Sequence, residues 1–311
     1  MLKSPFFTIT LTALTCTSFT SIADETTQTV NNTVVLSDGS AVTLPFHIEG
    51  QLTTALLSII DSKKARRFID HDDFKPIEIK CDGKGTGQGI GILYFQNITA
   101  SPVGAYAETV NTFAVQRKGA ADLPLPCLSE QASQQEKMNY LLAAQQILVA
   151  ANEEKMTAAE PLDYAMYNQH LELNNSAAIR AGIEIWGYPK SQAEFNYRID
   201  DQYVDLQVFD EPSGRAILGF TYQRQIGMQT PLLSVGDNVL PQSLLPSPEL
   251  HAQLSGMLSS TSGWVQPFNG YFWVGHAKSP TAKALRKLRF DPVAVIEYVN
   301  VKGTAYPLYS K

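Results

Sequence analysis

The segment that ends at Lys190 is the part of the sequence best suited to chemistry. This lysine follows Pro189, and Ile185, Trp186 and Tyr188 come shortly before it. A free lysine has a pKa near 10.4, so only about one in 2,500 is a neutral amine at pH 7. Burial among apolar side chains disfavours the ammonium form and lowers this pKa. These neighbours therefore suit a nucleophilic lysine, although most lysines are simply surface residues.

Other reactive groupings are weaker. The histidines form no H-E-x-x-H motif or other close pair, so we expect no metal site. The triplet at 71–73 (His-Asp-Asp) predicts a polar turn. The glycine-rich segment 83–89 matches neither a G-x-G-x-x-G nor a Walker A spacing, and no G-x-S-x-G elbow occurs. We therefore expect no cofactor and no serine hydrolase.

Residues 174–190, with the sequence NNSAAIRAGIEIWGYPK, resemble the signature of the acetoacetate decarboxylase family. In that family a strand ends in a glutamate, followed by a few apolar residues, an aromatic residue, a proline and a lysine. The lysine forms a Schiff base with a keto acid. Here Glu184, Tyr188, Pro189 and Lys190 stand at the matching positions.

A second motif lies upstream, where residues 104–108 resemble the Tyr-x-Glu strand of the family. Tyr106 and Glu108 match it, and the glutamate of the family faces the lysine. The sequence departs from the family in three ways. Ser191 stands where a second lysine is common, residues 118–165 lengthen the path between the motifs, and the N-terminal arginine that helps to hold the substrate carboxylate has no convincing counterpart.

The resemblance implies a function. Lys190 would form an imine with a β-keto acid such as acetoacetate. The imine would lose carbon dioxide, and hydrolysis would release acetone. Glu108 would move protons or orient the imine. The pocket would be lined by Tyr106, Tyr188 and Trp186. Two alternatives stay open: an aldolase or dehydratase that uses the same imine on a larger keto acid, and an exported ligand-binding protein without turnover. Relatives assemble as homo-oligomers, so we expect one here.

The many apolar or alternating runs bounded by turn residues predict an α+β fold dominated by antiparallel strands. The resemblance implies a cone-shaped β-barrel with flanking helices and the pocket inside. Apolar residues at helical spacing predict a helix over 52–69, and another is predicted over 129–155, within the insertion at 118–165. The predicted strands lie at 34–36, 42–44, 77–79, 89–95, 109–115, 195–198, 203–210, 216–223 and 293–301.

The first residues predict an export signal. Residues 1–23 carry one charge, Lys3, then an apolar stretch, and end in Ser21-Ile22-Ala23, which suits a signal peptidase. A transmembrane anchor is the alternative, but the stretch is short and interrupted by Thr and Ser. We expect residues 24–311 to form a single domain that is periplasmic or secreted.

The cysteine count fits export. Of the three cysteines, Cys16 would be removed with the signal peptide, which leaves Cys81 and Cys127. In an oxidising compartment an even pair can form a disulfide, although two buried free thiols remain an alternative.

The composition excludes other classes of protein. Hydrophobic residues make up 44% and charged residues 17%, which excludes an intrinsically disordered chain. The net charge of −6 leaves no basic surplus for binding nucleic acid. No segment after the signal reaches the length of a membrane span, so we expect no membrane partner once the signal is removed.

Overall fold

The structure is a computed structural model. It describes residues 32–157, 163–225, 230–231, 238–239, 243–244, 253–254, 256–259 and 262–305. The predicted signal peptide lies outside these residues.

Strands form most of the described chain. They are β1 (Asn32–Val35), β2 (Ala41–Leu44), β3 (Phe46–Asp61), β4 (Phe74–Pro76), β5 (Lys80–Cys81), β6 (Lys84–Gly85), β7 (Gln88–Ala100), β8 (Tyr106–Arg117), β9 (Tyr164–Leu173), β10 (Lys190–Ile199), β11 (Tyr203–Asp210), β12 (Arg215–Gln223), β13 (Thr230–Pro231), β14 (Asn238–Val239), β15 (Ser243–Leu244), β16 (Gln253–Leu254), β17 (Gly256–Ser259), β18 (Ser262–Pro267), β19 (Gly270–Val274) and β20 (Pro292–Ala305). The helices are α1 (Ser62–Ala65), the 3-10 turn η1 (Arg66–Phe68), α2 (Gln134–Thr157), α3 (Ser176–Trp186) and α4 (Pro280–Leu288).

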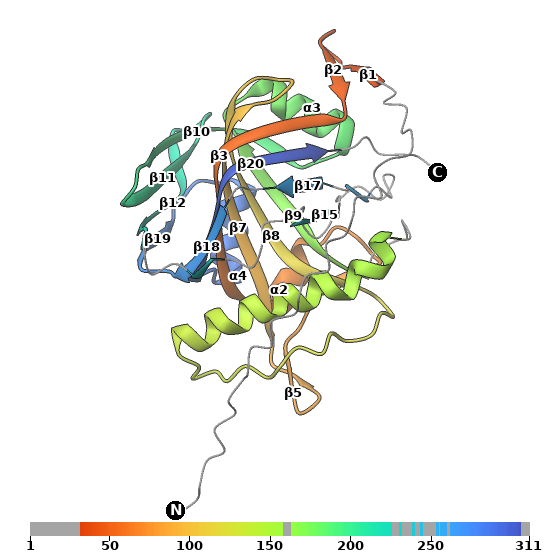
Figure 1. Ribbon diagram of the computed structural model, residues 1–311, viewed down its shortest axis with the longest axis vertical. Helices are drawn as coiled ribbons and strands as arrows, with labels where there is room; N and C mark the ends of the chain where they lie inside the picture. The colour runs from red at the N-terminus through yellow and green to blue at the C-terminus, as the bar shows by residue number, and fades with distance from the viewer. Residues whose placement is uncertain are drawn as a thin grey trace, which may run out of the picture. The chain divides into compact units, whose positions relative to one another are not determined.

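One large sheet organises the protein. Its main path runs β13-β18-β20-β3-β7-β8-β9-β10-β11-β12-β19, and most neighbours on it are antiparallel (Figure 1). The sheet curls, because Phe95 on β7 and Phe220 on β12 lie far apart in this order while their ring centroids are only 6.4 Å apart. The hydroxyls of Thr54 on β3 and Tyr222 on β12 also share a hydrogen bond of 3.1 Å. We call the face that carries these rings the inner face and the opposite one the outer face.

The helices cover both faces of the sheet. Helix α4 packs on the inner face, where Leu285 and Leu288 join the largest buried cluster. Helix α2 lies across β3, β9, β18 and β20, and buries its Leu141 and Leu148 on the outer face. Helix α3 contacts β9 and β10 and belongs to a third cluster, together with the β1–β2 hairpin. The predicted α+β fold with mostly antiparallel strands and flanking helices is thus confirmed.

Two sequence predictions about local structure are wrong. Residues 52–61 belong to strand β3, and only the short α1 and η1 follow. Both faces of β3 are buried, so apolar residues occupy consecutive positions and imitate a helical pattern. Residues 77–79 lie between β4 and β5 as irregular chain, with Ile77 held by its N–H to Ala114 O at 2.9 Å. The insertion does contain a helix, but α2 begins at Gln134 instead of residue 129.

The structure joins Cys81 and Cys127 in a disulfide, with their Cα atoms 4.8 Å apart. It ties β5 to the loop before α2. None of the helices in the described ranges is long and apolar enough to cross a membrane.

Candidate active site

The segment that carries the lysine motif folds as helix, turn and strand. The side chain of Asn175 caps α3 by accepting the N–H of Ala178 at 3.0 Å. The helix stops at Gly187, which adopts a left-handed conformation (φ 66°) that favours glycine. Pro189 cannot continue the helix, and Lys190 opens strand β10. The glutamate of the motif therefore lies on a helix and not, as the resemblance implies, at the end of a strand.

Two asparagines connect this segment to strand β8. The side-chain oxygen of Asn174 accepts the N–H of Ala107 at 2.8 Å. The side chain of Asn175 donates to Val103 O at 3.1 Å and to Ala105 O at 3.2 Å. These contacts hold the start of β8 against the start of α3. They thereby also position Glu108, the residue after Ala107.

The structure brings Lys190 and Glu108 together. Lys190 Nζ lies 3.8 Å from Glu108 Oε2, and the two side chains are 8% and 9% exposed. This separation is an ion-pair distance, longer than a hydrogen bond. Glu108 Oε2 is buried and has no hydrogen-bond partner among the residues that the structure describes.

Burial dominates the electrostatics of the pair. It lowers the pKa of Lys190 below its ordinary value, although the Glu108 carboxylate acts in the opposite direction. Burial likewise raises the pKa of Glu108, against the attraction of Lys190. Both changes favour the neutral partners, a free amine beside a protonated carboxyl. An amine nucleophile and an acid at one place are the groups that imine formation needs.

The pair lies on the outer face of the sheet. Lys190 is paired in parallel register with Leu171, and Glu108 in antiparallel register with Leu173; both leucines belong to the cluster under α3. Gly182 of α3 packs directly on the lysine: a β-carbon added there would lie 2.7 Å from Nζ. The resemblance implies a pocket inside the barrel, and for this pair that expectation is wrong. Successive residues of a strand face opposite sides of the sheet, so the next residue, Ser191, lies on the inner face.

The predicted pocket residues take different positions. The Tyr188 ring lies under Lys190, with Nζ 5.6 Å from the ring centroid. Tyr106 is buried, and its pKa is raised by burial, then by the charges of Glu108 and Tyr188. Trp186 is also buried, and its ring meets that of Phe46 edge-on, with centroids 5.4 Å apart. Tyr188 thus lies against the amine, Tyr106 lies near Glu108 and Tyr188, and Trp186 packs in the core.

Glu184 of the motif points away from the lysine. It is exposed and accepts hydrogen bonds from Ser37 N at 2.8 Å and Ser37 Oγ at 2.5 Å. Its neighbour Arg180 forms an ion pair with Asp38. Both partners lie in the turn of the β1–β2 hairpin, so the motif glutamate anchors that hairpin on α3.

A second buried polar group lies on the inner face of the same strands. Ser191 Oγ donates to Glu172, and His170 Nε2 lies 2.9 Å from Ser191 Oγ. Burial raises the pKa of Glu172 to about 7 and lowers that of His170 to about 4. His170 is therefore neutral at neutral pH, and Glu172 keeps its proton in a large fraction of the molecules.

Sequence reasoning missed Asn174, Asn175 and Gly182 as residues that position the site. One signal was available for the glycine. Glycine inside a helix costs about 1 kcal/mol relative to alanine, so its presence indicates a close approach.

Comparison with known proteins relates the chain through its fold. No family model matches it, and no curated protein matches its sequence. A solved structure described as acetoacetate decarboxylase from Legionella pneumophila subsp. pneumophila str. Philadelphia 1 matches with a TM-score of 0.50 and 13% identity, over 86% of this chain and 87% of that one. A second structure, from structural studies of acetoacetate decarboxylase, matches with a TM-score of 0.53 and 12% identity, over 85% and 87%. The chain therefore has the acetoacetate decarboxylase-like fold.

Proposed function

We propose that Lys190 forms a Schiff base with a β-keto acid and that the protein is a decarboxylase. The observation that carries this proposal is the burial of Lys190 beside Glu108, with Nζ 3.8 Å from Oε2 and the amine pKa lowered by burial. The fold shared with two solved acetoacetate decarboxylases supports it.

The reaction starts with the neutral amine of Lys190, which attacks the ketone carbon. Protonated Glu108 gives its proton to the departing oxygen, and water leaves. The product is an iminium cation beside the Glu108 carboxylate, whose negative charge stabilises it. Burial disfavours the formation of charge in this step, and the attraction between the adjacent iminium and carboxylate offsets that cost.

Bond cleavage follows from the imine. The bond to the β-carboxylate breaks, its electron pair moves toward the iminium nitrogen, and carbon dioxide leaves together with a neutral enamine. The enamine carbon then takes a proton that comes from solvent, and Glu108 is placed to relay it. Water hydrolyses the new iminium, which frees the ketone and restores the amine. One proton is consumed in each cycle.

We also propose that the protein works outside the cytoplasm. The leader-like residues 1–23 favour export, and the Cys81–Cys127 disulfide suits an oxidising compartment. Detection of the mature N-terminus in a periplasmic or culture fraction tests this proposal.

Trapping of the imine by borohydride tests the enzymatic proposal. Protein treated with acetoacetate and borohydride should carry a reduced adduct on the peptide that contains Lys190. The mass of the adduct also reports the chemistry, because it shows whether the carboxylate was lost before reduction. A Lys190→Ala variant should carry none. The variant Lys302→Ala removes a lysine that is 72% exposed and is the matched control.

A further inference from the structure

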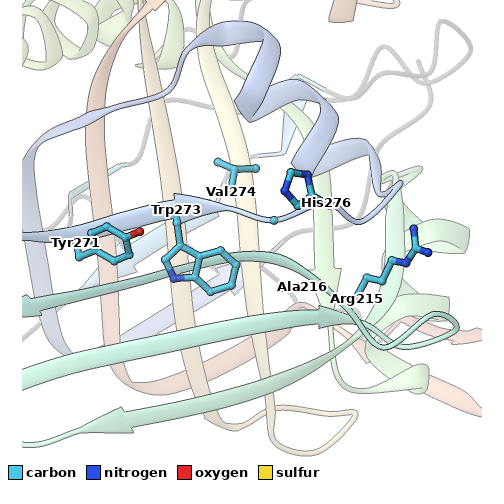
Figure 2. A pocket seen from close by; sticks show the side chains of 7 residues that line it. Arg215, Ala216, Tyr271, Trp273, Val274 and His276 are labelled. Carbon is cyan, nitrogen blue, oxygen red and sulfur yellow. The ribbon is translucent and has the colours of Figure 1, made fainter.

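A hollow on the protein surface lies apart from the lysine site. It has a volume of about 540 Å³, and Arg215, Ala216 and residues 271 and 273–276 line it. This volume falls within the range of about 300–1,000 Å³ that is usual for small-molecule sites. Neither Lys190 nor Glu108 is among the lining residues. Figure 2 shows Tyr271, Trp273 and His276 following one another along β19 and the turn after it, with Arg215 at the end nearer to His276.

Two aromatic side chains form one side of the hollow. Tyr271 and Trp273 alternate with Phe272 and Val274, which pack on the inner cluster, so the tyrosine and the tryptophan face outward. Tyr271 is 65% exposed. The indole of Trp273 extends over strand β12, since a β-carbon added to Gly219 would lie 2.5 Å from its Cζ2 atom. Because Gly219 has no side chain, the indole ring can pack directly against the backbone of the neighbouring strand.

Small residues keep the floor of the hollow open. Gly275 approaches the backbone of Ala216 so closely that a β-carbon there would collide with the Ala216 carbonyl. Gly275 also donates its N–H to Ile217 O at 2.8 Å. The chain therefore passes β12 at short range, and no bulky side chain fills the space between the aromatic rings and Arg215.

The polar groups around the hollow are free of protein partners. Arg215 and His276 are exposed, and the structure gives neither an ion pair nor a side-chain hydrogen bond to any residue of the described ranges. The same holds for the Tyr271 hydroxyl and the Trp273 ring nitrogen. No carboxylate is among the lining residues, and Arg215 supplies a positive charge to the hollow, with Asp210 opposite it on β11.

We propose that this hollow binds a small ring compound that carries a carboxylate, either an acidic sugar or an aromatic acid. The flat face of the ring stacks on Trp273, with Tyr271 beside it, because indole and phenol rings attract ring faces and C–H groups. The carboxylate pairs with Arg215, whose planar fork matches two carboxylate oxygens, and His276 adds a hydrogen bond. The site is independent of imine formation at Lys190.

Tryptophan fluorescence tests this proposal on the full protein. The probes are glucuronate, glucose and benzoate. Glucuronate or benzoate should change the emission in a saturable way, and the carboxylate should make glucuronate bind at least tenfold more tightly than glucose. Arg215→Gln should abolish that preference, and Trp273→Phe should remove most of the signal. Trp186 and Trp264 remain in that variant as internal references.

Two control variants show whether binding depends on the hollow itself. Tyr203→Ala removes another exposed tyrosine of the same sheet that does not line the hollow, and it should bind normally. Lys190→Ala should also bind normally, which separates this proposal from the decarboxylase. No saturable change with either acid would overturn the proposal, as would unaltered binding by both hollow variants. Sedimentation that shows Trp273→Phe converting an oligomer into monomers, without ligand binding in the wild type, would assign this face to contact between copies instead.

Discussion

The side chain of Lys190 occupies the space that a β-carbon on Gly182 would fill. Such a carbon would lie 2.5 Å from Lys190 Cδ and 2.7 Å from Nζ, far inside van der Waals contact. Helix α3 therefore fixes where the amine can be, and a glycine at this position makes that placement possible. The relationship ties the geometry of the helix to the chemistry of the lysine, which leads to the first prediction.

Gly182→Ala should reduce imine formation much more than stability. The added methyl displaces the amine, and a misplacement of about 1 Å can cost roughly a hundredfold in rate. Overpacking costs about 1–3 kcal/mol of unfolding free energy, but alanine returns up to about 1 kcal/mol of helix propensity. Borohydride trapping rates and urea unfolding measure the two effects. Ile183→Ala, at an exposed neighbouring position, should trap normally; an unchanged rate in Gly182→Ala would contradict the packing argument.

Glu108→Gln should change both the rate of imine formation and its pH dependence. Loss of the acid removes general acid–base catalysis, worth about 10²–10⁴ in rate. The Glu108 carboxylate raises the pKa of Lys190, so its removal should lower that pKa further. The part of the pH–rate profile that reports the amine should therefore move to lower pH. The exposed Glu184→Gln change is the control, and a profile that moves to higher pH would refute the assigned role.

Glu172→Gln should alter how stability depends on pH. Burial raises the pKa of Glu172 to about 7 from an ordinary value of 4.5. The folded protein holds this proton more tightly than the unfolded chain, so the stabilisation is complete below pH 4.5 and is lost as the pH rises to about 7. The full loss corresponds to about 3 kcal/mol.

Urea unfolding at pH 5 and pH 8 measures this effect. The wild type should lose more stability between these two values than Glu172→Gln does. The variant Glu194→Gln, at an exposed position on β10, should behave as the wild type. Equal pH dependence in the wild type and in Glu172→Gln would show that Glu172 ionises normally in the folded protein.

The Cys81–Cys127 disulfide should stabilise the protein. It closes a loop with a sequence separation of 46 residues, and chain-entropy arguments assign such a loop about 4 kcal/mol. Dithiothreitol should lower the melting temperature of the wild type and leave that of a Cys81→Ser/Cys127→Ser variant unchanged. If the reductant has no effect on the wild type, the two thiols are not joined in solution.

The sequence predicted the strands better than the placement of the site. Strands β11, β12 and β20 alternate or run apolar between clear turn signals, and they were correctly expected. Strand β3 was missed because both of its faces are buried, so its pattern carries no period of two. The same limit applies to the side of the sheet on which a residue lies. A shift of one residue exchanges the faces, and the sequence alone does not fix the register of Lys190 against Leu171.

The family resemblance predicted that Lys190 and Glu108 are partners. In the structure Lys190 Nζ lies 3.8 Å from Glu108 Oε2. The hollow beside Trp273 could not be predicted in this way. It depends on Arg215 and Tyr271 coming together across β12 and β19, and on two glycines whose tight contacts appear only in three dimensions.

The most direct test of the proposed function is mass spectrometry after borohydride reduction in the presence of acetoacetate. We predict a reduced adduct on the peptide that contains Lys190, without the carboxylate, in the wild type and in Lys302→Ala, and no adduct in Lys190→Ala. An adduct that keeps its carboxylate would support imine formation but contradict decarboxylation. A folded wild-type protein in which Lys190 stays unmodified by acetoacetate and by other keto acids would contradict the Schiff-base mechanism itself.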